Sequence, residues 1–234
     1  MVKKSVLMAV VLGWILLGMM CGCSIEEFLY GHEQIVQSFA LDSIPEYDGA
    51  SYVVIDDNEP SFDDDDKSAG VFEVYGPFDD LGRCTYAFAK IGLETMPEEE
   101  RGSIGQIKPT GWHTVKYDIV SGKYLYNRCH LIGYQLTGEN ANEQNLITCT
   151  RQTNVGPMLE FENMVAEYVK ETGNHVLYRS TPIFDGNNLL ASGIHMEGYS
   201  VEDFGDGIKF NVYVYNVQDG IAIDYATGDS RLEE

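Results

Sequence analysis

Polar side chains of the types that take part in catalysis gather in two short stretches, residues 126–134 and 142–154. The first is predicted to end a strand with Asn127, Arg128, Cys129 and His130, directly before an apolar run. In the second, Asn145 and Arg151 precede Asn154, which opens a predicted helix. Histidine can take up a proton near neutral pH, arginine binds anionic oxygens, and amide oxygens hold hard cations. One short module thus carries the side chains for proton transfer on an anionic substrate.

The clearest helix is predicted over residues 154–172. A rotation of about 100° per residue places five apolar side chains on one face: Met158, Phe161, Val165, Tyr168 and Val169. Gly173 and Asn174 are typical of a helix end. Asn154 lies at the head of the inward face and Glu162 at its edge. Two polar groups beside an apolar stripe need a partner, which a metal ion or a buried hydrogen-bond network would provide.

The other elements are predicted to be strands. Short β-branched or aromatic runs between turn residues occur at 71–75, 84–89, 123–126, 145–149, 176–184, 188–193 and 208–217. Residues 185–188 (Asp-Gly-Asn-Asn) are typical of a hairpin turn. In the last run, apolar Phe210, Val212 and Val214 alternate with other types, which indicates a sheet with two unlike faces. We expect an α+β fold with a central antiparallel sheet and one main helix.

The chain is strongly acidic. Its 234 residues include 37 acidic and 15 basic ones, for a net charge of −22. A hydrophobic content of 44% excludes general disorder, and the net charge excludes non-specific binding of nucleic acid by the whole surface. Residues 101–135 differ, because Asp118 is the only acidic residue among five basic ones. This basic strip leads into the polar module, either as a phosphate-binding surface or as a solvated loop.

Residues 1–22 are predicted to be a signal peptide with a lipobox. Lys3 and Lys4 precede an apolar run over residues 6–20, and the following Gly22-Cys23 is similar to the end of a bacterial lipobox. Cys23 would then carry the lipid. Simple cleavage with release and an uncleaved anchor are the alternatives, and all three place the domain outside the cytoplasm. No second long apolar run follows, which excludes a protein with several membrane spans.

Residues 23–66 are predicted to form an acidic tether. The run Asp63-Asp64-Asp65-Asp66 lacks the alternating ligands and the glycine turn of a calcium loop, so we expect it to be exposed. Residues 52–55 are a candidate first strand within this segment. Beyond it lie Cys84, Cys129 and Cys149, an odd number that allows one disulfide with a free thiol, or three reduced thiols.

The polar module resembles that of the DNA/RNA non-specific endonuclease family, whose members carry a ββα-metal module. The likeness is greatest to secreted streptococcal-type DNases. The family signature is Asp-Arg-Gly-His at a strand end, then an asparagine-rich loop, then a helix opened by a metal-binding asparagine. Residues 127–130, Asn145 and Asn154 match these positions, with Asn127 in place of the aspartate and Cys129 in place of the glycine. The endonuclease domain is expected over residues 67–234.

The resemblance implies a role for each matching residue. Asn154 would hold Mg²⁺ or another divalent cation such as Mn²⁺, and His130 would take a proton from the attacking water. Arg128 would stabilise charge on the reacting phosphate. Further implied roles are orientation of the loop or of metal-bound waters by Asn145, and a hold on a metal-bound water or an arginine by Glu162. Asn127 and Arg151 are candidate substrate contacts, and for Arg151 an ion pair with Glu160 or Glu162 is the alternative.

The resulting expectation is an extracellular, metal-dependent nuclease that hydrolyses DNA, with RNA as a second candidate substrate. It would sit on the outer face of a bacterial membrane through its lipid, without a protein partner. Asn127 keeps one alternative open, a catalytically inactive nucleic-acid-binding lipoprotein of the cell surface. A nuclease effector used against competing cells is a third hypothesis. His113, His175 and His195 are interpreted as structural. Trp112 and Tyr134 are interpreted as aromatic core, with stacking on nucleic-acid bases as the alternative.

Overall fold

The computed structural model describes residues 44–233. The predicted signal peptide, Cys23 and the first part of the predicted tether lie outside the described residues. Within residues 44–233, no helix combines the length and the apolar character needed to cross a membrane.

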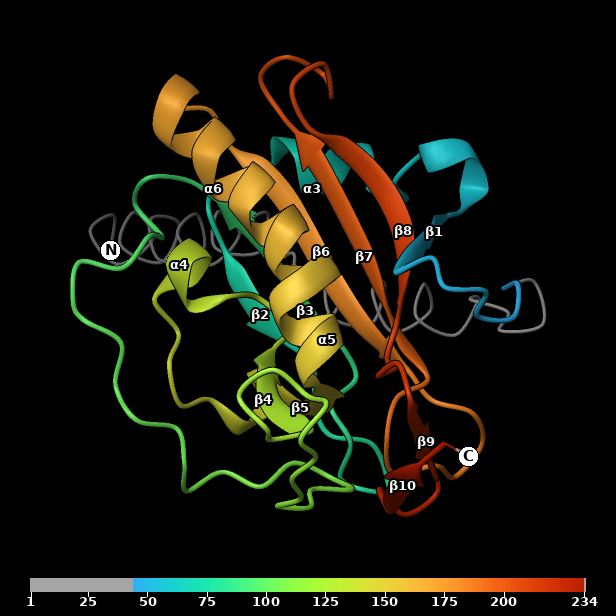
Figure 1. The fold of residues 1–234 in the computed structure, drawn as a ribbon. Coiled ribbons are helices and arrows are strands. Elements are labelled where there is room, and N and C mark those ends of the chain that lie inside the picture. Colours follow the sequence, from blue (N-terminus) through green and yellow to red (C-terminus); the bar gives the residue numbers. More distant parts are fainter. Residues whose placement is uncertain (1–43, 234) are drawn as a thin grey trace, which may run out of the picture. The chain divides into compact units, whose positions relative to one another are not determined.

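A six-stranded antiparallel sheet forms the centre of the fold (Figure 1). Its strands, in spatial order, are β1 (Tyr52–Val54), β8 (Lys209–Tyr215), β7 (Gly193–Ser200), β6 (Val176–Ile183), β3 (Ala87–Ile91) and β2 (Glu73–Tyr75). The long strands β6, β7 and β8 are joined in sequence as a meander, as the hairpin signal at 185–188 predicts. The α+β fold with a central antiparallel sheet is therefore confirmed.

Helix α6 (Leu159–Thr172) lies across one face of this sheet (Figure 1). Phe161, Val165 and Val169 are buried in the core that the helix and sheet share. The helix ends where Gly173 adopts φ +73°, the left-handed conformation that glycine enters without steric cost. The predicted inward face and end of the helix are confirmed.

The start of the predicted helix at Asn154 is wrong in detail. A short helix α5 (Arg151–Thr153) is followed by a wide turn, η4 (Asn154–Met158), before α6 begins. Pro157 has no N–H to donate, and Gly156 has a non-helical backbone with φ −97° and ψ −110°. The wide turn therefore separates Asn154 from the regular helix while keeping it at the helix head.

The part of the predicted tether that the structure describes, residues 44–66, is folded onto the sheet. β1 pairs with β8, which confirms the candidate first strand. A turn η2 (Asp56–Asn58) and helix α3 (Asp64–Ser68) follow. Asp63 and Asp66 form a capping box at the start of α3, and Asp66 is only 1% exposed. A free tether over 44–66 is thus wrong, because backbone pairing and helix capping outweigh the mutual repulsion of the acidic side chains.

The face of the sheet opposite α6 contains a buried ion pair. Arg179 on β6 donates from Nε to the Glu197 carboxylate on β7 at 2.8 Å, and both side chains are at most 2% exposed. Ser61 donates its backbone N–H and its hydroxyl to the same carboxylate, each at 2.8 Å. These bonds attach the segment between β1 and β2 to the sheet.

Glu197→Gln should lower the free energy of unfolding by about 3–5 kcal/mol, because it leaves the Arg179 charge buried without its counterion. Urea unfolding followed by circular dichroism measures this. Glu59→Gln is the matched control, since Glu59 pairs with Lys209 at the surface with 64% of its side chain exposed; its effect should stay below about 1 kcal/mol. Equal losses in the two variants would contradict this assignment.

Two small sheets lie beside the central one. β4 (Tyr126–His130) pairs with β5 (Leu146–Thr150), and β9 (Ile221–Ile223) pairs with β10 (Ser230–Leu232). The connection from β4 to β5 contains α4 (Tyr134–Thr137) and a short turn, η3 (Glu143–Asn145). The β4–β5 hairpin and the head of α6 together form the predicted ββα arrangement.

Two predicted strands need correction. The strand predicted at 123–126 begins only at Tyr126 and runs through the polar residues to His130, because these pair with β5. Residues 188–193 form a loop instead of a strand. Leu190 donates its backbone N–H to the Tyr225 carbonyl at 3.0 Å, so this segment bonds to the region before β10 and the next strand starts at Gly193.

Candidate active site

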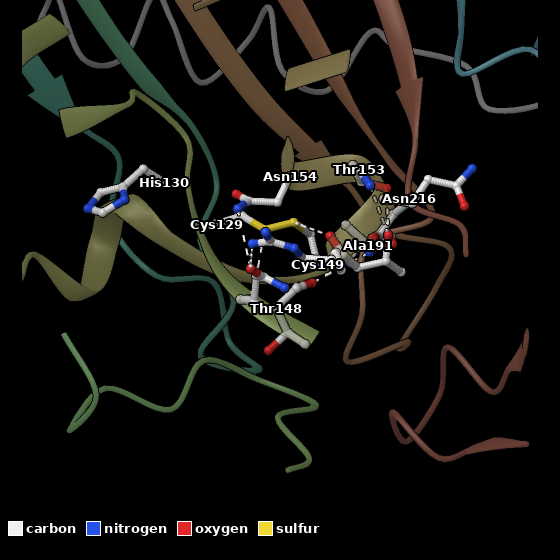
Figure 2. The surroundings of a disulfide bond; sticks show 12 residues. Cys129, His130, Thr148, Cys149, Thr153, Asn154, Ala191 and Asn216 are labelled. Carbon is white, nitrogen blue, oxygen red and sulfur yellow. Dashed lines mark hydrogen bonds between the residues drawn. A yellow bond between two sulfur atoms is a disulfide. The ribbon is translucent and has the colours of Figure 1, made fainter. Parts of the chain in front are cut away.

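A disulfide joins the two strands of the β4–β5 hairpin. Cys129 and Cys149 are bonded, with their Cα atoms 5.8 Å apart, and both side chains are fully buried (Figure 2). Cys84 is free, and burial raises the pKa of its thiol to about 12. The sequence left open either one disulfide with a free thiol or three reduced thiols, and the structure has one disulfide and one free thiol. Cys129, which replaces the glycine of the family signature, thus cross-links the strands that carry the polar module.

His130 lies at the end of β4 and is 6% exposed. Its Nε2 is 2.8 Å from the backbone carbonyl oxygen of Asn140. A carbonyl can only accept, so Nε2 carries the hydrogen and Nδ1 keeps its lone pair. Burial lowers the pKa of His130 to about 4; the Asn140 carbonyl opposes this shift and the nearby charge of Arg101 adds to it. His130 is therefore a neutral base at pH 7.

The guanidinium of Arg101 lies next to Nδ1 of His130, the nitrogen that keeps its lone pair. Its Nη2 is 3.3 Å from His130 Nδ1, and its charge also acts on Glu162. The sequence indicates Arg101 only as one member of the basic strip. Its contact with His130 was not predicted, because it depends on the path of the long irregular connection between β3 and β4.

Asn127 accepts hydrogen bonds from two other predicted site residues. Arg151 Nη1 lies 3.3 Å and Asn154 Nδ2 3.4 Å from Asn127 Oδ1. Asparagine and aspartate both present an acceptor oxygen at this position, so the departure from the family signature retains that function. The amide of Asn154 is oriented so that Nδ2 faces Asn127.

Arg128 is held by the connection that precedes β4. It donates to the carbonyl oxygens of Gly105, at 2.8 Å, and Ile107, and its guanidinium carbon lies 3.9 Å from the ring centre of Trp112. Burial lowers the pKa of its guanidinium. Arg128 thus fixes this connection in addition to facing the cleft described below.

Asn145 lies away from the cleft. It is fully buried, accepts from the Ile132 N–H at 2.9 Å and donates to the Ile132 carbonyl at 3.0 Å. Both bonds go to the backbone directly after His130. Of its two expected roles, this geometry favours orientation of the loop over contact with metal-bound waters.

Glu162 lies behind the segment that follows His130. It is 8% exposed, and burial raises the pKa of its carboxyl to about 8, against the opposing effects of Arg101 and the Gly133 N–H. A Cβ on Gly133 would come within 2.4 Å of Glu162 Oε2, so this close approach requires glycine. Glu162 does not line the cleft. The charge of Arg101, which acts on this carboxyl, favours the expected interaction with an arginine over one with a metal-bound water.

A cleft of about 570 Å³ opens beside the hairpin. Its lining includes the polar side chains Arg101, Asn127, Arg128, Arg151 and Asn154. Trp112, Thr114, Ser121, Gly122, Tyr124 and Tyr126 also line it. Three arginines therefore converge on one cleft in a chain of strongly negative net charge, which is the arrangement that an anionic substrate requires.

The remaining aromatic and histidine predictions can be compared with this cleft. His113, His175 and His195 do not line it, and each bonds to a nearby carbonyl, carboxylate or amide, as expected for structural residues. Tyr134 donates to the Glu99 carbonyl at 2.7 Å. Trp112 is partly buried and packs against a core cluster that includes Leu125 and Tyr126, as its interpretation as core predicts, and it also lines the cleft.

The hairpin, the histidine at the end of its first strand and the asparagine at the helix head define a ββα nuclease module. Residues 62–202, more than half of the chain, match the family model described as DNA/RNA non-specific endonuclease. The chain therefore belongs to the DNA/RNA non-specific endonuclease family.

Solved structures share this fold. NucA from Streptococcus agalactiae with bound magnesium is 23% identical, with a TM-score of 0.73 over 86% of this chain and 97% of that chain. The same protein without metal is 23% identical, with a TM-score of 0.71 over 91% and 99%. The Sda1 nuclease with bound zinc is 25% identical, with a TM-score of 0.57 over 71% and 81%.

Proposed function

We propose that this protein is an extracellular, divalent-metal-dependent nuclease that hydrolyses DNA and RNA, with His130 as the general base. The observation that carries the proposal is the state of His130. Its Nε2–H is fixed by Asn140, and its Nδ1 lone pair is directed at Arg101, which lines the arginine-rich cleft. A neutral imidazole beside a phosphate-binding cleft suits deprotonation of a water that attacks a phosphodiester.

Asn154 is the candidate metal ligand. Its Nδ2 is engaged by Asn127, and no donor among residues 44–233 contacts its Oδ1. Within the same range, no group of three or more His, Cys, Asp or Glu residues could hold a metal ion. A single neutral oxygen ligand suits Mg²⁺, which keeps most of its waters, and Mn²⁺ is the alternative. Bound there, the ion would neutralise charge on the phosphate and assist departure of the leaving oxygen.

The arginines complete the proposed mechanism. A phosphodiester that enters the cleft offers its anionic oxygens to Arg101, Arg128 and Arg151, all of which line it. Contact of Arg101 with phosphate would free His130 Nδ1 to accept a proton from water. The same guanidinium groups would then stabilise the charge that develops on the phosphate during attack. Asn145 and Glu162 act indirectly, because both hold the backbone that follows His130.

The pH dependence of kcat/KM tests the identity of the base. The base must be deprotonated, so activity should be constant near neutral pH and fall only as the pH drops through about 4, the pKa of His130. Arg101→Met should move this acidic limb to higher pH, because the guanidinium charge lowers that pKa. An acidic limb that Arg101→Met leaves at the wild-type position would contradict the assignment.

We also propose that the protein is attached to the outer face of a bacterial membrane through lipid on Cys23. The apolar run before Gly22-Cys23 supports this, and disulfides such as Cys129–Cys149 persist in oxidising compartments. Two further structures of this fold, each 20% identical, are of proteins described as an extracellular endonuclease and an extracellular nuclease. Labelled palmitate fed to a producing bacterium should be incorporated into the wild type and not into Cys23→Ser. Equal labelling of both would refute lipidation at Cys23.

A further inference from the structure

The cleft extends beyond the residues that the proposed mechanism uses. Six lining residues that the mechanism does not use, here called the aromatic groove, are Trp112, Thr114, Ser121, Gly122, Tyr124 and Tyr126. The groove is continuous with the phosphate-binding part through Asn127 and Arg128, which directly follow Tyr126 on β4. When a substrate is held by its phosphate, the nucleoside next to that phosphate therefore extends into or past this groove. A cleft of about 570 Å³ is within the usual size range for small-ligand sites.

Trp112 presents a donor without an acceptor. Its indole Nε1–H is buried, and no residue within 44–233 accepts a hydrogen bond from it. The ring itself is held in place, because the Arg128 guanidinium lies 3.9 Å from its centre. A buried donor without a partner destabilises the protein unless a ligand supplies an acceptor. Nucleotides offer such acceptors on the phosphate, the sugar and the base.

Tyr124 presents an aromatic surface to the solvent. The residue is 47% exposed although it lines the groove, and Lys116 Nζ lies 4.4 Å from its ring centre. Tyr126, beside it in the groove, is buried and donates its hydroxyl to the Gly228 carbonyl at 2.9 Å, which fixes the floor. Lys116 lies over one face of this ring, which leaves the other face for stacking. An exposed ring together with a lysine is the combination that binds bases and backbone of a single strand.

We infer that the aromatic groove binds the nucleoside next to the scissile phosphate, with an unpaired base stacked on Tyr124 and the Trp112 N–H donated to an oxygen of that nucleotide. This inference rests on the proposed nuclease function. Within a duplex, the faces of each base are covered by its neighbours, so only an unpaired or locally unstacked base can use this surface. The preferred substrate class is therefore single-stranded or locally melted nucleic acid.

The test uses single-stranded oligonucleotides that each contain one cleavable linkage. The intact strand carries a base on both sides of this linkage, and two further strands are abasic on one side or on the other. For wild-type protein, removing the base on the groove side should lower kcat/KM about tenfold, the usual size of one stacking contact. Tyr124→Leu should lose about the same factor on the intact strand and nothing further on the abasic one. Trp112→Phe keeps the ring over Arg128 and should lose roughly 2- to 10-fold, as expected for one hydrogen bond.

Phe204→Leu is the matched control, because Phe204 is 84% exposed and does not line the cleft. It should cleave all the strands as the wild type does. Equal cleavage of intact and abasic strands by the wild type, or an unchanged Tyr124→Leu, would overturn the inference while leaving the nuclease function intact. If the wild type cleaves no strand, the nuclease function fails. Fluorescence anisotropy with the same strands then tests whether the groove binds a base. Equal affinity for strands with and without the base overturns the inference.

Discussion

His130→Ala is expected to lower kcat on DNA by about 10²–10⁴-fold, the usual contribution of a positioned general base. The variant removes the imidazole of His130, whose Nδ1 contacts Arg101 in the lining of the cleft. The effect should fall on kcat more than on KM, because the arginines of the cleft remain. Initial rates on a defined oligonucleotide measure both.

His113→Ala is the matched control for this variant, since His113 is exposed, does not line the cleft, and has its contacts with the Thr227 carbonyl and the Asp229 carboxylate. It should keep wild-type activity. Added imidazole should restore part of the activity of His130→Ala, provided that it enters the space of the missing ring. A folded His130→Ala protein with kcat within threefold of the wild type would exclude His130 as the base.

Asn154→Ala should lower kcat/KM by at least about 10²-fold in the presence of Mg²⁺. Loss of the ion removes several kcal/mol of charge stabilisation in the transition state, and each 1.36 kcal/mol corresponds to a factor of ten. Affinity for Mn²⁺, followed by electron paramagnetic resonance, should fall in the same variant. Asn154→Asp retains an oxygen ligand and should continue to bind the ion.

Asn163→Ala, in the helix α6 that follows the wide turn, is the control, because Asn163 is exposed and accepts from Gln135 at the surface. It should change neither metal affinity nor rate. If Asn154→Ala binds Mn²⁺ as tightly as Asn163→Ala does, the metal lies elsewhere in the molecule.

Much of the module could be predicted from local sequence signals. The apolar stripe of α6 repeats with helical spacing, and the glycine at 173 ends it as a left-handed cap. The polar run 127–130 and the asparagine at 154 match a signature with fixed positions along the chain. Each of these features depends on residues near one another in sequence, so pattern and structure agree.

The features that were missed depend on contacts between distant segments. Arg101 reaches His130 across 29 positions through an irregular connection, and no periodic pattern encodes such a path. Glu162 was placed at a helix edge, but the absence of a side chain on Gly133 lets the backbone cover it. The acidic run 63–66 was predicted to be exposed, and its first three residues are, but Asp66 is buried by its capping box. Ser61, which bonds to the buried Glu197, attaches the same segment to the sheet.

The most direct test of the central claim is cleavage by the full chain. Purified wild-type protein is incubated with supercoiled plasmid DNA and with RNA, in Mg²⁺, in Mn²⁺ and in EDTA, and the products are separated on gels. We expect both nucleic acids to be degraded without a preferred sequence in the presence of the divalent ion, and both to stay intact in EDTA. A folded protein that leaves both substrates intact with Mg²⁺, Mn²⁺ and Zn²⁺, or that cleaves them equally well in EDTA, would contradict the proposed metal-dependent nuclease.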